Sequence, residues 1–307
     1  MNQWIDWEVA LSTAKALTPA GPALDGAQAA RIVAELRQAA ELGLRKAEAI
    51  SGLGSTKPAQ VLVVDRAGWA KAVSQNFAAM MPELPSTPPS VPVIAGAELG
   101  VVLSILSTRV LGQFDPYSGS RLLLNAPTIT QIRGEMNLNA ADFYLWIATH
   151  EQTHRLQFEV ATWVPEVMRE TLAAIFTGTG GKTRSMTEIG QRVKSLRSEV
   201  GELTTIMSVL EGHAMAVMND VHDIPSIKTI RQRFAARGQN RGVIATWVGK
   251  LLGMDAKARQ YERGEKFVRH IVGQIGYDGF NRIFESRQAF PTASELDHPQ
   301  QWLARMA

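Results

Sequence analysis

The sequence predicts a mainly α-helical protein with a minor β element. Two observations carry this prediction: long Ala-, Leu-, Glu- and Arg-rich stretches place apolar residues at helical spacing, and the segments that suit strands are short. The composition agrees, because 45% of the 307 residues are hydrophobic and 20% are charged. Such a chain is typical of globular proteins and can bury one sizeable core or two joined lobes.

The first elements follow from spacing. Residues 26–50 predict a helix, because their apolar residues form one stripe: Ile32, Leu36, Ala39, Ala40 and Leu44. Residues 61–65 predict a short strand or the approach to a helix over residues 66–80.

A proline-rich segment interrupts the chain. Residues 82–92 contain five prolines, which exclude a regular helix and indicate a connector. We therefore expect one domain over residues 1–307, in which this connector joins an N-terminal helical sub-lobe (1–81) to a second sub-lobe (93–307).

Later elements are again mostly helical. We expect a buried core helix over 95–112, a strand over 121–127 that ends in a turn, a helix over 187–221, and two or three helices within 227–284. A short C-terminal helix begins near Ser294. The Gly-Lys-Thr string in residues 177–185 resembles a phosphate-binding loop, but Phe176 stands where that loop needs glycine, so a solvated loop is the better interpretation.

Charge and cysteine content exclude other classes. The net charge is only +3 despite a pI near 9.2, and no dense basic block is present, so nucleic acid is not an expected partner. The most apolar stretch contains Glu98 and Arg109, and its uncharged part is too short to span a bilayer. The N-terminus lacks the pattern of a signal peptide. The absence of cysteine suits the reducing cytoplasm and excludes thiolate ligands and nucleophiles.

The helix after residue 139 carries the main chemical signal. Asn139 is a good N-cap, and Asp142 stands where an acidic side chain can accept from the first turn. Apolar residues and two histidines then share one stripe: Phe143, Ile147, His150, His154 and Phe158. Pro165 is expected to end or kink this helix.

The stripe contains the motif HEQTH, residues 150–154. His150 and His154 lie one turn apart on one face, so both imidazoles can reach one ion. Glu151 points about a quarter turn away, where its carboxylate can serve as acid and base without binding the metal. Since the chain has six histidines, chance would produce this pattern only about 0.006 times. The motif predicts a site for one Zn²⁺ per chain.

A third ligand must come from elsewhere. The extended pattern with a third histidine is absent, and Gln157 occupies its glycine position. Glu211, in the apolar stretch VLEGHAMAV, is the only glutamate embedded in such a helix and is the expected ligand. His213 lies about 200° further around that helix, although Gly212 could loosen this constraint. His213 is therefore expected beside the ligands or in the substrate cleft, with the ligand role as the alternative.

Several strings together indicate a family. HEQTHRLQF, LEGHAMAVM, YERGEKFV, FNRIFES and PTASELDHPQQWLAR resemble the bacterial family of zincin-like, zinc-dependent metallopeptidases. Some members have names that associate them with deazaflavin-coenzyme biosynthesis. The resemblance covers nearly the whole chain and implies a mainly helical zincin-like fold, with His150, His154 and Glu211 as metal ligands and Glu151 as catalytic acid/base.

Two functions are consistent with these residues. The first is a cytoplasmic zinc hydrolase acting on a peptide or a small amide. The second is a catalytically silent scaffold that binds a partner. Glu151 favours the hydrolase, because a scaffold needs no acid/base residue beside its ligands. The sequence leaves endopeptidase, aminopeptidase and amidase open, and also the oligomeric state.

Overall fold

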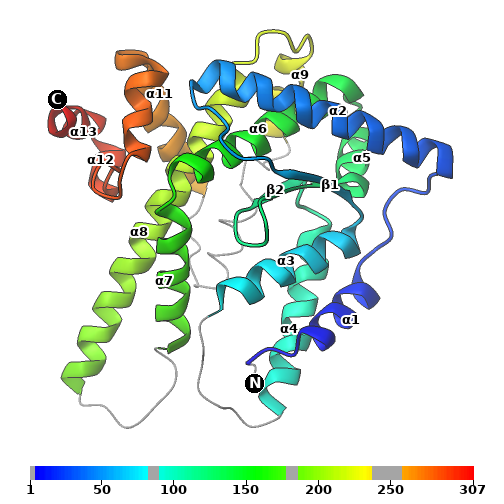
Figure 1. Cartoon of the computed structure of the whole chain (residues 1–307), viewed down its shortest axis with the longest axis horizontal. Helices are drawn as coiled ribbons and strands as arrows, with labels where there is room; N and C mark the ends of the chain where they lie inside the picture. The colour runs from blue at the N-terminus through cyan, green and yellow to red at the C-terminus, as the bar shows by residue number, and fades with distance from the viewer. Residues whose placement is uncertain (1–3, 82–89, 178–185, 237–257) are drawn as a thin grey trace.

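A small three-stranded sheet lies among many helices (Figure 1). The computed structural model describes residues 4–81, 90–177, 186–236 and 258–307. The described elements, in chain order, are α1 (Trp7–Leu17), α2 (Gly26–Ser51), β1 (Gln60–Val64), α3 (Arg66–Met80), α4 (Ser90–Ser107), β2 (Gly112–Asp115), β3 (Arg121–Asn125), α5 (Ala126–Glu135), α6 (Ala140–Val160), α7 (Val164–Thr177), α8 (Met186–Asn219), α9 (Ile227–Ala236), α11 (Ala258–Phe280), a 3₁₀ turn η1 (Asn281–Phe284), α12 (Ala293–Asp297) and α13 (Pro299–Met306). The predicted mainly α class is confirmed.

The sheet divides two layers of helices. Its order is β1-β3-β2, with β1 parallel and β2 antiparallel to the central β3. Side chains of a strand alternate between faces, and β3 shows this clearly. Leu122 and Leu124 pack in the core with residues of α2 and α6, whereas Leu123 packs with residues of α1, α3 and α4. Because the strand order places β2 at one end, β2 is an edge strand of this sheet, and it contacts α6.

Helix α6 lies between α2 and α8, and glycines bring the neighbouring helices close. A Cβ on Gly43 of α2 would stand 2.7 Å from the backbone carbonyl carbon of Ala148 in α6. On the other side of α8, a Cβ on Gly212 would stand 2.4 Å from the backbone of Gly264 in α11. Because real Cβ contacts are not this short, both crossings require glycine.

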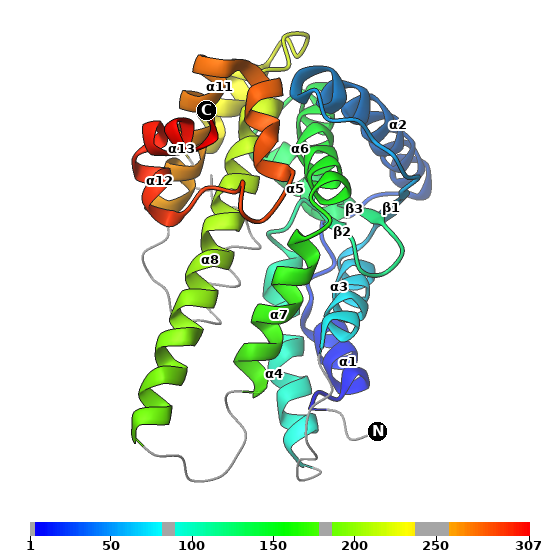
Figure 2. The same cartoon turned by 60° about the vertical axis from the view of Figure 1, so that its left-hand side comes forward.

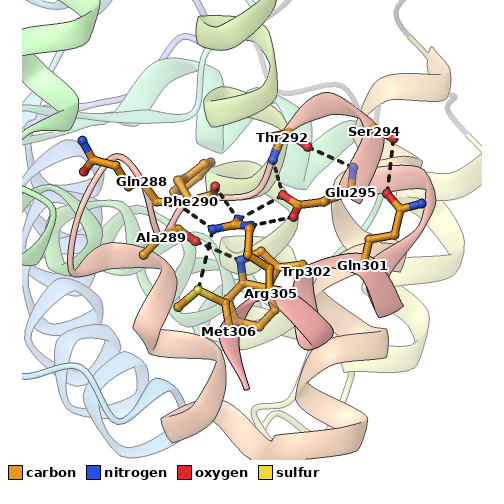
Figure 3. Close-up of polar contacts among 10 residues, drawn as sticks. All are labelled: Gln288, Ala289, Phe290, Thr292, Ser294, Glu295, Gln301, Trp302, Arg305 and Met306. Carbon is orange, nitrogen blue, oxygen red and sulfur yellow. Dashed lines mark hydrogen bonds and ion pairs between the residues drawn. The ribbon is translucent and has the colours of Figure 1, made fainter.

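A further hydrophobic core, besides those on the two faces of the sheet, joins the C-terminal helices to α8. Figure 2 shows α7 and α8 side by side, with α11, α12 and α13 gathered at one end of α8. The last two helices are held by an ion pair between Glu295 and Arg305 (Figure 3). Nearby, the indole Nε1 of the fully buried Trp302 donates to the carbonyl of Ala289 at 2.9 Å.

Two predicted segments differ from the structure. The predicted 95–112 helix is α4, which begins earlier, at Ser90, and ends at Ser107, and Gly112 starts a strand. It is not wholly buried, because four apolar side chains remain exposed: Val93, Ile94, Val101 and Ile105. The face of α4 that carries Gly96 and Gly100 packs closely against α1. The part of the proline-rich connector that is described, residues 90–92, is helical, since proline is tolerated in a first turn.

Three local predictions also need correction. The strand β3 passes directly into α5 without a turn. Asn139 does cap α6, but the carboxylate of Asp142 accepts from the backbone and hydroxyl of Ser226. Pro165 neither ends nor kinks α6, which stops at Val160; it lies in the first turn of α7, where its missing N–H costs nothing.

Some predictions fall on other parts of the chain. Most of the predicted 177–185 loop and residues 82–89 of the connector lie outside the described residues. The division into sub-lobes stays a prediction, and the pairing of β1 with β3 is a direct link between the two proposed parts. Among the described helices, none combines the length and the hydropathy needed to cross a membrane.

Candidate metal centre

The two histidines of the motif lie in the buried middle of α6. The helix starts at the cap of Asn139, whose Oδ1 accepts from the backbone N–H of Asp142 at 3.1 Å. One face of the helix contacts α2, where the side-chain amide of Gln152 donates to the carbonyl of Ala40 at 2.9 Å. The opposite face presents His150 and His154 to α8. Packing on both sides therefore fixes the rotation of α6.

Glu211 of α8 completes a cluster with these histidines. The Nε2 atoms of His150 and His154 are 3.1 Å apart. Each Nε2 also lies 3.6 Å from a carboxylate oxygen of Glu211. The side chains of His150, His154 and Glu211 are only 17%, 9% and 5% exposed. We call these three residues the triad.

The donor atoms of the triad are close enough to share one metal ion. Ligand atoms about 2.0–2.2 Å from one tetrahedral ion are about 3.3–3.6 Å apart. The two Nε2 atoms are 3.1 Å apart, each lies 3.6 Å from a different oxygen of Glu211, and one donor atom from each residue lies within 4.8 Å of the other two. By contrast, 3.6 Å is too long for a hydrogen bond between an imidazole and a carboxylate. Two imidazoles and one carboxylate are also a ligand set typical of zinc sites with an open fourth position. His150, His154 and Glu211 can therefore hold a divalent metal.

Gln157 fixes the orientation of His154. Its side-chain oxygen lies 2.9 Å from Nδ1 of His154, while its Nε2 donates to the carbonyl of Leu210 at 2.8 Å. Because an amide oxygen only accepts, Nδ1 of His154 carries the proton and its Nε2 presents a lone pair to the triad. The same amide joins α6 to α8 one residue before Glu211.

His213 lies away from the triad. Its ring is fully buried and packs on Phe280, with ring centroids 5.0 Å apart, and on Phe284 and Tyr277. Its Nδ1 lies 2.9 Å from Nε2 of Gln157, so this amide connects it to His154. Gly212 does not loosen the helix, because α8 continues through it from Met186 to Asn219. Its missing side chain instead allows the contact with α11.

Glu151 lies beside the edge strand β2. A Cβ placed on Gly112 would stand 2.6 Å from Cγ and 3.0 Å from Oε1 of Glu151, so only glycine leaves room for this side chain. Glu151 is 6% exposed. Burial raises its pKa to about 7, against the lowering effect of His150. A buried carboxylate with this pKa can both accept and return a proton near neutral pH.

The imidazoles and Glu211 have shifted pKa values as well. Burial lowers the pKa of His154. Burial also acts to lower the pKa of His150, but the nearby carboxylates of Glu211 and Glu151 outweigh it and the pKa is raised. Burial acts to raise the pKa of Glu211, yet the two imidazoles outweigh it and the pKa is lowered. The pKa of His213 falls to about 3, chiefly through burial, so this ring is neutral.

Comparison with known proteins places this arrangement in a family. Residues 5–303 match the zincin-like metallopeptidase family. The chain belongs to this family. The zincin-like resemblance predicted from the sequence is therefore confirmed, and membership supports a metallohydrolase.

A solved structure agrees over the whole chain. It is a crystal structure of a candidate hydrolase with a novel fold from Chloroflexus aurantiacus, 29% identical, with a TM-score of 0.78 and coverage of 98% of each chain. No curated protein matches this sequence.

Sequence reasoning missed two residues of the centre. Gln157 was considered only as a departure from a glycine pattern, although its place three residues after His154 puts it within reach of that ring. Gly112 carried no signal, because only the folded strand brings it to Glu151.

Proposed function

We propose that this protein is a zinc-dependent peptidase in which His150, His154 and Glu211 bind the metal and Glu151 is the catalytic acid and base. The observation that carries the proposal is the triad geometry with a buried carboxylate beside it: one donor atom from each of the three residues lies within 4.8 Å of the other two. Membership in a metallopeptidase family supports the same reaction class. One zinc ion per chain is expected.

Each residue of the site is expected to have a separate role in the reaction. A bound zinc ion would supply Lewis-acid activation of water and of the substrate carbonyl. Gln157 keeps the lone pair of His154 Nε2 directed at the triad. Glu151 takes a proton from the attacking water and returns it to the leaving amine. The edge strand β2 leaves space for that side chain at Gly112.

The substrate is expected to be a peptide or a small amide. Because the chain has no cysteine, all of these groups work unchanged in a reducing compartment, and we propose a cytoplasmic role. The alternative, a silent scaffold, gives no use to a buried carboxylate held beside the ligands.

The test replaces Glu151 by Gln, which keeps size and helix propensity but cannot accept a proton. A diverse peptide pool is incubated with zinc-loaded wild type, chelated wild type and the Glu151→Gln variant, and products are read by mass spectrometry. Cleavage should appear with zinc-loaded wild type and fall about a hundredfold to ten-thousandfold in the variant, while zinc content and circular dichroism stay unchanged. Equal cleavage by the variant, or no cleavage by any sample, would contradict the proposal.

A further inference from the structure

An apolar cavity adjoins the triad. Its volume is about 130 Å³, and its wall includes His154 and Glu211. The remaining wall comes from α3, α4, α6, α7, α8 and the β2 segment, with side chains such as Trp69, Val73, Phe114, Leu172, Met207 and Leu210. By the same measure one water molecule occupies about 10–15 Å³, so the cavity can hold on the order of ten water-sized groups, such as methylene or ring CH groups. That is the size of a large apolar side chain.

Two other polar side chains of the wall already form hydrogen bonds. The amide of Asn76 donates to Asp115 at 2.7 Å, and the hydroxyl of Tyr117 donates to the carbonyl of Pro165 at 2.9 Å. Among the described lining residues, Gln113, His154, Glu211 and the indole N–H of Trp69, which is buried without a hydrogen-bond partner, remain to meet polar atoms of a ligand. Because most of the other lining side chains are apolar, a ligand in this cavity keeps its apolar end inside and its polar backbone at the triad.

The lining residues of α6 and α8 show on which side of the triad the cavity lies. Phe158 lies one turn beyond His154 on α6, and Met207 lies one turn before Glu211 on α8; both line the cavity. A second hollow lies the other way along the same two helices, at Trp146 and Met215.

That second hollow has a different character. It is also lined by Lys228 and Arg231 of α9 and by Glu265 of α11. Charged walls disfavour a large apolar group, because burying apolar and charged groups together leaves the charges poorly solvated. A substrate that spans the triad would place its apolar group on the Phe158 and Met207 side.

We propose that the apolar cavity binds a large apolar side chain, such as that of Phe, Leu or Met, next to the scissile bond of a peptide substrate. This inference rests on the proposed function and names its substrate class. The cavity shares its wall with the triad, so a side chain held there brings its own backbone amide to the reacting centre.

The first test measures binding without metal or catalysis. N-acetyl-phenylalanine amide and N-acetyl-alanine amide are titrated into the chelator-treated full chain and followed by ligand-detected NMR. The phenylalanine amide should bind about tenfold or more tightly, because burying its ring removes apolar surface from water. Equal affinity for the two amides would overturn the inference.

Cavity filling gives the matched comparison. Val73→Phe on α3 adds a ring to the wall, and Val101→Phe makes the same change on the exposed face of α4. The first variant should lose the tenfold preference and the second should keep it. Leu203→Phe, on the α8 wall, repeats the test if circular dichroism shows that Val73→Phe does not fold.

The second test uses the peptide pool with zinc-loaded protein. Wild type and Val101→Phe should cut next to Phe, Leu or Met, and Val73→Phe should shift to sites flanked by Ala or Gly. Cleavage without such a preference would overturn the cavity inference and leave the proposed function standing. Selective binding of the phenylalanine amide with no cleavage would support the cavity and contradict only the proposed function.

Discussion

Two buried glutamates of this protein have opposite surroundings. The side chain of Glu211 in the triad is 5% exposed and that of Glu295 near the C-terminus is 8% exposed. Glu295 receives two bonds from the guanidinium of Arg305, at 2.7 and 3.0 Å, and one from the backbone N–H of Thr292 at 2.8 Å (Figure 3). Glu211 faces two imidazole nitrogens at 3.6 Å.

The difference separates a carboxylate that is neutralised by an ion pair from one that can hold a metal ion. A buried carboxylate is costly unless its charge is compensated and its oxygens are bonded. Arg305 is a permanent cation and meets this need for Glu295. The imidazoles near Glu211 are weak cations that stand too far away for hydrogen bonds, so a divalent ion is the partner that suits this carboxylate. The variants below test this contrast.

The largest effect is expected for Glu211→Gln, which keeps the shape but removes the ligand charge. Loss of a group that only supports a ligand costs about 10- to 100-fold in metal affinity, and loss of a ligand itself should cost at least 100-fold. Zinc affinity is measured by competition with a chelating dye. Glu295→Gln is the matched control and should bind zinc like wild type. Equal zinc affinity of the two variants would contradict a metal-binding role for Glu211.

Gly112→Ala should reduce turnover by about 100-fold, because the new Cβ displaces Glu151 and misplacement of a catalytic group by about 1 Å has this effect. Zinc content should not change, since none of the triad atoms is among the three nearest to the new Cβ. Gly134→Ala, whose Cβ would meet nothing within 4 Å, is the control. Peptide cleavage rates and zinc content are measured together, and unchanged turnover in Gly112→Ala would show that Glu151 is not catalytic or not constrained.

Gln157→Leu should lower zinc affinity by about 10- to 100-fold, because His154 loses the acceptor that fixes its proton on Nδ1. Gln152→Leu removes another buried amide of the same helix, whose one hydrogen bond among the described residues goes to the carbonyl of Ala40. The second variant should lose stability but keep its zinc affinity. If both variants lost zinc equally, general disturbance of α6 would explain the result.

The smallest effect is expected for Glu295→Gln, about 1 kcal/mol of unfolding free energy, since Arg305 is 38% exposed and the ion pair is screened by solvent. Burial acts to raise the pKa of Glu295, but the guanidinium of Arg305 and the N–H of Thr292 outweigh it, so the pKa is lowered.

The contribution of this ion pair is therefore fully present above the ordinary glutamate pKa and is lost as the pH falls through the lowered value. Urea unfolding should show the two proteins differing at pH 7 and converging in acid. The exposed Glu285→Gln is the control, and a difference between Glu295→Gln and wild type that grows in acid would contradict this assignment.

The sequence predicted those parts of the fold that depend on local spacing. The apolar stripe of residues 26–50 and the cap at Asn139 were enough for α2 and α6, because periodicity and capping are local properties. The strand β2 was missed, since four residues at the sheet edge carry too short a pattern. The exposed face of α4 was also missed, because apolar composition alone does not show which face finds a partner.

The residues of the site also divide into those that a local sequence pattern predicts and those that it does not. His150, Glu151 and His154 are one helical motif, and Glu211 stood out as a carboxylate in an apolar stretch. The structure brings His150, His154 and Glu211 together across α6 and α8. Gly112 could not be assigned, because its role depends on a distance between β2 and α6. For Gln157, the spacing from His154 was available along one helix, but its bond to Leu210 of α8 was not.

The most direct test of the metal centre is an anomalous-difference map of zinc-equilibrated crystals, collected above and below the zinc absorption edge. One peak per chain is expected above the edge, and it should vanish below the edge. It should lie about 2.0–2.2 Å from Nε2 of His150, Nε2 of His154 and an oxygen of Glu211. A peak that omits Glu211, a peak bound by His213, or no peak among these side chains at saturating zinc would contradict it.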